Sequence, residues 1–213
     1  RSIIIIFSLK KEKKKYIYKY IYEKEKKEKW ENLGVSIRQA NYDNVSEMKE
    51  AFKGGDRIYI VSAVTIGETR VRQHKNVVDA AIAAGVQHIT YTSFLGASDP
   101  RYAHVYVTPD HTATEAYIRE RAAETGIKYV FMQDNLYLEN YLTTSVMLAL
   151  MSDNKWYTTA GEGRATYVPK DDVARMAAAL LLGKGKDNTT YKACGCESLS
   201  QRDLAAMISD LSG

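Results

Sequence analysis

Apolar runs and segments with helical spacing alternate along the chain from residue 33 onward. The runs with strand character cover residues 35–39, 57–61, 86–91, 127–132 and 190–193. The segments with helical spacing cover residues 44–52, 69–84, 108–125, 136–151, 171–182 and 200–211. Because strands joined by such helices need right-handed crossovers, the pattern predicts an α/β fold with a doubly wound parallel sheet.

The run at residues 86–91 is the most informative of these strands. It is β-branched and aromatic, which is typical of a strand covered on both faces, and it leads into Tyr91, Thr92 and Ser93. Two other runs also lead into small or polar residues, namely Ser62-Ala63 and Gln133-Asp134-Asn135. Since ligands bind at the carboxyl ends of strands in open α/β sheets, these three strand ends predict a ligand crevice.

The last three elements predict a small C-terminal cap. They are the helix at residues 171–182, the strand at 190–193 and the helix at 200–211. No Pro-, Gly- or Ser-rich linker separates them from the preceding segments. We therefore expect one domain over residues 33–213.

Residues 1–32 differ in composition and consist mostly of Lys, Glu, Tyr and Ile. The apolar start of about eight residues is shorter than the roughly 20 that cross a bilayer, and no small-residue cleavage site follows it. We interpret this segment as a low-complexity basic arm, with translated non-coding sequence as the alternative. Residues 3–7 retain enough apolar character to form a central strand.

The positive charge of the chain lies almost wholly in this arm. Residues 1–31 hold 11 basic and 5 acidic residues, whereas the remaining chain holds 19 basic and 21 acidic residues. The body therefore has no basic excess of the kind that nucleic-acid backbones require. We expect no nucleic-acid partner and no membrane partner.

Cysteine and histidine usage argues against a metal site. Cys194 and Cys196 are too close together for a disulfide framework, and no histidine is spaced to share a metal with them. We interpret both as reduced structural thiols of a cytoplasmic protein.

Seven short segments together resemble the NmrA-like family of atypical short-chain dehydrogenases, and within it the NAD(P)H:quinone oxidoreductases. Read in chain order, they span the chain from residue 34 to residue 174. They are residues 34–42, 73–81, 84–86, 91–93, 110–115, 137–141 and 167–174. Each match alone is weak, whereas their common order is specific.

The resemblance implies a Rossmann-like fold and an NAD(P)H-dependent oxidoreductase that reduces quinone-like substrates by hydride transfer. It implies NADP, or NAD, as the cofactor. The implied cofactor-binding residues are Ser62, Ala63, Tyr91, Thr92, Ser93, Asp134, Asn135, Tyr137, Glu139 and Asn140. The implied quinone site is formed by Phe94, Tyr137 and Tyr141.

Two helical residues are the catalytic candidates. His111 and Glu115 lie one turn apart on a predicted helix, so they are able to share a face and deliver a proton to a quinone oxygen. The alternative is that His111 packs against the sheet without a catalytic role. The Tyr-x-x-x-Lys pair of ordinary short-chain dehydrogenases occurs only at Tyr20/Lys24 and Tyr22/Lys26, within the arm, which argues against an alcohol-dehydrogenase mechanism.

The chain departs from the family at its start. The arm stands where the family has its first βαβ unit with a Gly-rich phosphate turn, and the first glycine of the chain is Gly34. Gln133 stands where relatives often have arginine. Two alternatives therefore remain beside the enzyme: an NAD(P)-sensing regulatory protein with a protein partner, or an inactive truncated chain. A homodimer is a further expectation.

Overall fold

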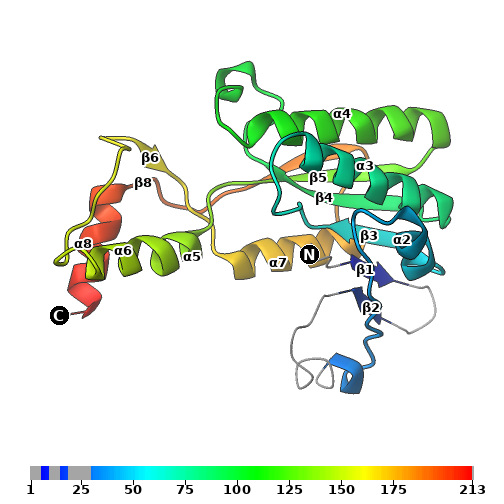
Figure 1. Ribbon diagram of the computed structural model, residues 1–213, viewed down its shortest axis with the longest axis horizontal. Helices are drawn as coiled ribbons and strands as arrows, with labels where there is room; N and C mark the ends of the chain where they lie inside the picture. Colours follow the sequence, from blue (N-terminus) through cyan, green and yellow to red (C-terminus); the bar gives the residue numbers. More distant parts are fainter. Residues whose placement is uncertain (1–5, 10–14, 19–29, 213) are drawn as a thin grey trace. The chain divides into compact units, whose positions relative to one another are not determined.

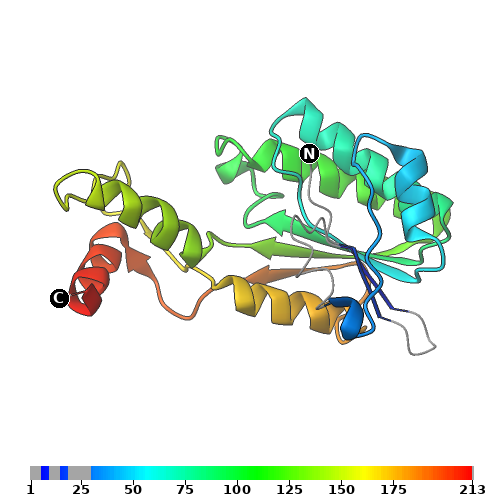
Figure 2. The same cartoon turned by 60° about the horizontal axis from the view of Figure 1, so that its bottom comes forward.

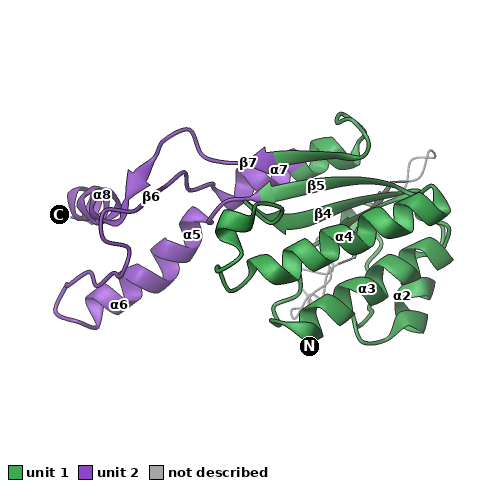
Figure 3. Cartoon of the chain, turned by 90° about the horizontal axis from the view of Figure 1, so that it is seen from above, with its two compact units in different colours: residues 1–133, 177–191 green, residues 134–176, 192–213 purple. Residues whose placement is uncertain are grey.

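The computed structural model describes residues 6–9, 15–18 and 30–212 of the chain. The described chain forms two compact units (Figure 3). Unit 1 runs up to Gln133 and includes Ala177–Tyr191, and unit 2 contains Asp134–Met176 and the chain from Lys192 onward. The sequence suggested one domain for residues 33–213, so the structure divides this region more finely.

Unit 1 is built around a four-stranded sheet. Its strands are β3 (Arg57–Ile60), β4 (His88–Phe94), β5 (Lys128–Asp134) and β7 (Thr189–Ala193), in the order β3-β4-β5-β7. The strands β3 and β4 pair in parallel, with Ile60 opposite Tyr91. The last residues of β5 and β7 belong to unit 2.

Helices cover both faces of this sheet (Figures 1 and 2). One face carries α2 (Val45–Phe52), α3 (Glu68–Ala83) and α4 (Thr108–Thr125), with the short η1 (Pro100–Tyr102) before α4. The other face carries residues 177–181 of α7 (Lys170–Leu181). The crossovers β3-α3-β4 and β4-α4-β5 confirm the Rossmann-like, doubly wound fold.

Local sequence signals explain where these helices begin and end. The side chain of Asn44 accepts a hydrogen bond from the Glu47 amide at 3.2 Å and caps α2. Gly126 ends α4 with a φ of 76°, and its amide donates to the Ala122 carbonyl at 2.9 Å. This left-handed conformation favours glycine, so the end of α4 is fixed by residue type.

The apolar faces of these elements meet in one core. Among the described residues, its larger members are Tyr42, Met48, Phe52, Ile58, Ile60, Val77, Val78, Ile89, Tyr91, Ile118 and Phe131. The helix residues among them recur at helical spacing, and those of the strands sit in the centre of the sheet. The core therefore fixes the register of the strands whose ends carry the candidate site.

An antiparallel pair of strands precedes this sheet. β1 (Ile6–Leu9) pairs with β2 (Lys15–Tyr18), and β1 lies beside β3. A family member with an ordinary first βαβ unit would have a parallel crossover here, so this unit is altered, as predicted. The rest of the arm, including Tyr20/Lys24, Tyr22/Lys26 and most of the expected strand at residues 3–7, lies outside the described residues.

Unit 2 contains a continuous helical segment and a small two-stranded sheet. α5 (Leu138–Asn140), the π-helical η2 (Tyr141–Ser145) and α6 (Val146–Leu150) follow one another directly. β6 (Arg164–Ala165) pairs antiparallel with β8 (Leu199–Ser200), which leads into α8 (Gln201–Ser212). Ser200 and Asp203 cap α8 reciprocally through their side chains and amides, at 3.1 and 2.8 Å.

Three expectations about local structure are wrong. Residues 35–39 form no named strand, because Arg38 turns to the end of α2 and donates to the carbonyls of Ala51 and Lys53 at 3.0 and 2.9 Å. The strand near residues 190–193 belongs to the main sheet instead of a separate cap. Cys194 and Cys196 are exposed, so neither is a buried structural thiol.

Within the described part of the chain, none of the helices combines the length and apolar character needed to cross a membrane. Within the same residues, no group of three or more His, Cys, Asp or Glu side chains is arranged to hold a metal ion.

Candidate functional site

The carboxyl ends of β3 and β4 bring the predicted hydroxyl residues of unit 1 together. The Ser62 hydroxyl donates to the Thr92 carbonyl at 2.5 Å, and the Ala63 amide donates to Nε2 of His74 at 2.9 Å. Thr92 is buried, yet among the described residues its Oγ1 atom has no hydrogen-bond partner. An unpaired buried hydroxyl is costly, so this position is suited to a ligand.

Tyr91 is the centre of a buried polar network. Its hydroxyl lies 2.8 Å from Nδ1 of His111, 3.4 Å from Nδ1 of His74 and 3.4 Å from Oγ of Ser62. Tyr91 and His74 are fully buried, and His111 is nearly so. The network joins β4 to the helices α3 and α4.

Glu115 belongs to a second network. Its carboxylate accepts hydrogen bonds from Ser93 at 2.6 Å, Ser98 at 2.8 Å, Gln133 at 2.9 Å and Arg119 at 2.9 Å. Glu115 is fully buried, and these donors occupy both of its oxygens. The two predicted catalytic residues are therefore one turn apart on α4, as expected, but they have separate partners.

Burial determines the protonation of the Tyr91 network. It lowers the pKa of His111 to about 3, with a smaller contribution from the positive charge of Arg70. It lowers the pKa of His74 to about 3, again with repulsion from His111 and Arg70. Burial also raises the pKa of Tyr91. Both imidazoles and the phenol are thus neutral at physiological pH.

Asp134 is the most perturbed carboxyl group of unit 2. Burial raises its pKa to about 7, against the opposing effect of its hydrogen bond from Tyr137. The Tyr137 hydroxyl lies 2.7 Å from Oδ2, whereas the buried Oδ1 has no partner. A carboxyl group that titrates near neutrality is a frequent mark of functional sites.

The other predicted residues of unit 2 surround the start of α5 and α7. Asn135 donates to the Thr166 hydroxyl at 2.7 Å, and Glu139 accepts from the Lys170 amide at 2.8 Å. Asn140 is exposed. The ring of Tyr141 packs edge-on against Tyr167, with centroids 4.9 Å apart.

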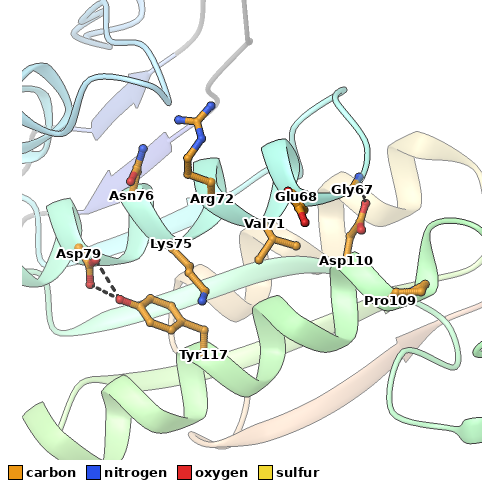
Figure 4. Close-up of a pocket in the computed structure, with 10 residues that line it drawn as sticks. All are labelled: Gly67, Glu68, Val71, Arg72, Lys75, Asn76, Asp79, Pro109, Asp110 and Tyr117. Atoms are coloured by element: carbon orange, nitrogen blue, oxygen red, sulfur yellow. Dashed lines mark hydrogen bonds between the residues drawn. The ribbon is translucent and has the colours of Figure 1, made fainter.

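A groove that the sequence did not predict lies between α3 and α4 (Figure 4). It has a volume of about 660 Å³, and none of the predicted cofactor or substrate residues lines it. Its lining mixes both charges, and Tyr117 donates to Asp79 across it at 2.7 Å. The lining residues are Gly67, Glu68, Val71, Arg72, Lys75, Asn76, Asp79, Pro109, Asp110 and Tyr117.

Sequence reasoning missed His74, Arg70 and Ser98. His74 lies within one of the matched segments, but a single histidine on an amphipathic helix gives no sign of its partners. Arg70 forms a buried ion pair with Asp110 at 3.5 Å, and this pair depends on the packing of α3 against α4. The roles of these residues can be recognised only from the contacts between helices in the structure.

Comparison with known proteins agrees with this fold. The model of the NmrA-like family matches residues 6–213, so the match begins at β1. Quinone oxidoreductase 2 of Escherichia coli is 30% identical over 180 residues, which cover 84% of this chain and 59% of that protein. The chain therefore spans less than two thirds of this relative.

Solved structures give the same assignment. The NADPH complex of the NADPH-dependent quinone oxidoreductase from Escherichia coli has a TM-score of 0.76 and 29% identity, covering 90% of this chain and 64% of that one. The NADP(H) complex of triphenylmethane reductase from Citrobacter sp. has a TM-score of 0.77 and 30% identity. The match covers 90% of this chain and 65% of that one. Together with the family match, these similarities show that the chain belongs to the NmrA-like family.

Proposed function

We propose that this protein is an NAD(P)H-dependent oxidoreductase that reduces small quinone-like substrates by hydride transfer. The observation that carries the proposal is the unpaired, buried hydroxyl of Thr92 at the carboxyl end of β4. In open α/β sheets, this edge is where nucleotide ligands bind. The relatives named for NADPH and quinone share this fold at about 30% identity.

The residues at the strand ends fit part of a nicotinamide cofactor. In unit 1, Thr92 and Ser62 offer hydroxyl groups at the strand ends. When bound, the cofactor supplies the hydride, and the protein supplies binding and orientation.

Three aromatic residues support the proposed substrate class. Phe94 and Tyr141 are half-buried, as is Tyr137, so each ring retains an accessible surface. A flat quinone stacks favourably on such rings. We propose Phe94 as a substrate contact in unit 1; within unit 2, Tyr137 and Tyr141 are the corresponding aromatic candidates.

The role of Thr92 is testable with a matched pair of variants. Thr92→Val removes the unpaired hydroxyl, and we expect the KM for NADPH to rise about threefold to tenfold, as for one lost hydrogen bond. Thr90→Val is the control, because Thr90 lies two residues earlier on β4 and also has an unpaired buried hydroxyl. Steady-state oxidation of NADPH with a panel of quinones measures both. Equal KM values for the two variants would contradict the role of Thr92.

Thermal melting separates the enzyme from the two alternatives. A shift of Tm by NADPH together with quinone turnover supports the enzyme. A shift without turnover favours an NAD(P)-sensing regulatory protein. No shift at millimolar NADPH indicates a chain that does not bind the cofactor.

A further inference from the structure

The buried network around Tyr91 fixes the position of every proton in it. His74 is the starting point, because its Nε2 atom lies 2.9 Å from the Ala63 amide, which is only able to donate. The neutral imidazole of His74 therefore carries its proton on Nδ1. That proton points to the Thr114 hydroxyl at 2.9 Å, which in turn donates to the Asp110 carbonyl at 2.8 Å.

Ser62 supplies the second constraint. Its single hydroxyl proton is used in the bond to the Thr92 carbonyl at 2.5 Å. Neither Ser62 nor His74 is then the main acceptor for Tyr91, since His74 Nδ1 is protonated and the Ser62 oxygen lies 3.4 Å away. The Tyr91 proton therefore goes to Nδ1 of His111, at 2.8 Å.

This assignment determines the tautomer of His111. Because Nδ1 accepts from Tyr91, the neutral ring carries its proton on Nε2. Among the described residues, Nε2 of His111 has no hydrogen-bond partner. This atom is not fully enclosed by the surrounding protein. The Nε2 edge therefore reaches the surface of unit 1. The ring lies against Phe94, a proposed substrate contact, with centroids 6.1 Å apart and planes 29° apart.

We propose that His111 is a catalytic residue that donates a hydrogen bond from neutral Nε2–H to a carbonyl oxygen of the substrate, and that Tyr91 is the positioning residue that fixes this tautomer. The inference rests on the proposed quinone reduction. Hydride addition to a quinone places an electron pair on a carbonyl oxygen, while the nicotinamide donor is oxidised. The Nε2–H group stabilises this oxyanion, which then takes a proton from solvent water.

The surroundings of His111 disfavour the alternative role of a general acid. From α3, Arg70 and His74 face the ring, and from β4, Tyr91 does so. On α4, the carboxylate of Asp110 pairs with Arg70, and that of Glu115 accepts from its own donors. Burial, with a smaller contribution from the positive charge of Arg70, keeps His111 neutral. A neutral imidazole stabilises an oxyanion without giving up its proton.

The tautomer is measurable without any turnover. In protein labelled with ¹⁵N histidine, we expect the His111 resonances to show a neutral ring protonated on Nε2 throughout pH 5 to 8. In Tyr91→Phe the Nδ1 atom loses its donor, and we expect a mixture of tautomers. Protonation of Nδ1 in the wild-type protein, or an imidazolium form at pH 6, would overturn the proposal.

Kinetics then test the catalytic role. His111→Phe keeps a ring beside Phe94 but removes the donor, and we expect kcat to fall about 100-fold with the KM for NADPH unchanged, as for an oxyanion donor. His111→Gln, which keeps an N–H group, should recover part of this loss. His104→Phe is the control, because His104 is an exposed histidine in the segment between η1 and α4. Circular dichroism confirms that each variant folds.

The outcomes distinguish this inference from the proposed function. Quinone turnover by the wild type that is unchanged in His111→Phe overturns the catalytic role of His111 alone. Wild-type protein that shows the Nε2–H tautomer but no turnover with any quinone contradicts the proposed function, and the catalytic role with it. A wild-type kcat that falls on deprotonation of a group near pH 6 would overturn the neutral donor in favour of a general acid.

Discussion

At the scale of single residues, the candidate site depends on how buried polar groups are paired. Glu115 is a fully buried carboxylate whose oxygens accept four hydrogen bonds, one of them from Arg119. A buried charge is tolerated only when it is paired in this way, and loss of a partner is costly. Glu115 therefore links β4, β5 and the loop before α4 through Ser93, Gln133 and Ser98.

Replacing this carboxylate should destabilise the fold. In Glu115→Gln the amide nitrogen meets groups that are themselves donors, so we expect the free energy of unfolding to fall by about 1–3 kcal/mol. Glu120→Gln on the same helix is the control, because Glu120 is exposed. Urea denaturation measures both variants. Equal stabilities would show that the Glu115 network contributes little.

Asp134 gives the stability of the protein a dependence on pH. Its pKa in the folded protein is raised to about 7. The folded state therefore binds the Asp134 proton more tightly than the unfolded state does. The contribution of this proton to the free energy of unfolding is present at low pH and is lost as the pH rises from about 4 to about 7. We expect Asp134→Asn to abolish this part of the decline and to match or exceed the wild type at pH 8.

Urea denaturation across pH 4 to 8 checks this sign. Asp210→Asn is a suitable control, since Asp210 is an exposed residue of α8. A wild-type curve that rises through this range relative to Asp134→Asn would contradict the assigned role.

The buried polar groups also show what the sequence was able to predict about the site. Ser62, Tyr91, Thr92 and Ser93 were identified because strand ends follow directly from the apolar pattern. The hydrogen-bond partners of these residues were not identified from the sequence, because His74 approaches Ala63 only when α3 packs on the sheet. Periodicity identifies a face of a helix, but it does not reveal which polar atoms meet across it.

At the scale of elements, local signals were sufficient for the regular crossovers. The helical segments predicted at residues 44–52 and 108–125 have the expected ends, with the Asn44 side chain capping α2 and Gly126 ending α4. The alternating pattern of residues 35–39 failed because alternation does not show that Arg38 turns to the carbonyls at the end of α2. The π-helical turn η2 was not predicted, as it has no distinct sequence pattern.

The cap of α2 offers a direct test of this local reasoning. Asn44→Ala removes the acceptor for the Glu47 amide, and we expect a loss of about 1 kcal/mol in the free energy of unfolding. Asn44→Asp keeps the acceptor and should be nearly neutral. Thermal or urea unfolding measures the difference. An equal loss in both variants would mean that the side chain acts in some other way.

At the scale of the whole molecule, the sheet and its crossovers are those of the NmrA-like family, whereas the start of the chain is altered. The antiparallel pair β1-β2 stands beside β3 in the described chain, and the sequence provides no early Gly-rich turn. The fold class followed from the alternation of strands and helices. The division into two units could not be predicted from the sequence, because no linker marks the boundary between them.

The most direct test of the proposed function is hydride transfer itself. The purified chain is mixed with a quinone and with NADPH deuterated at the carbon that transfers hydride. We predict NADPH oxidation that depends on the quinone and is slower with the deuterated cofactor under single-turnover conditions. Tight binding of NADPH with no oxidation in the presence of any quinone tested would contradict the proposal.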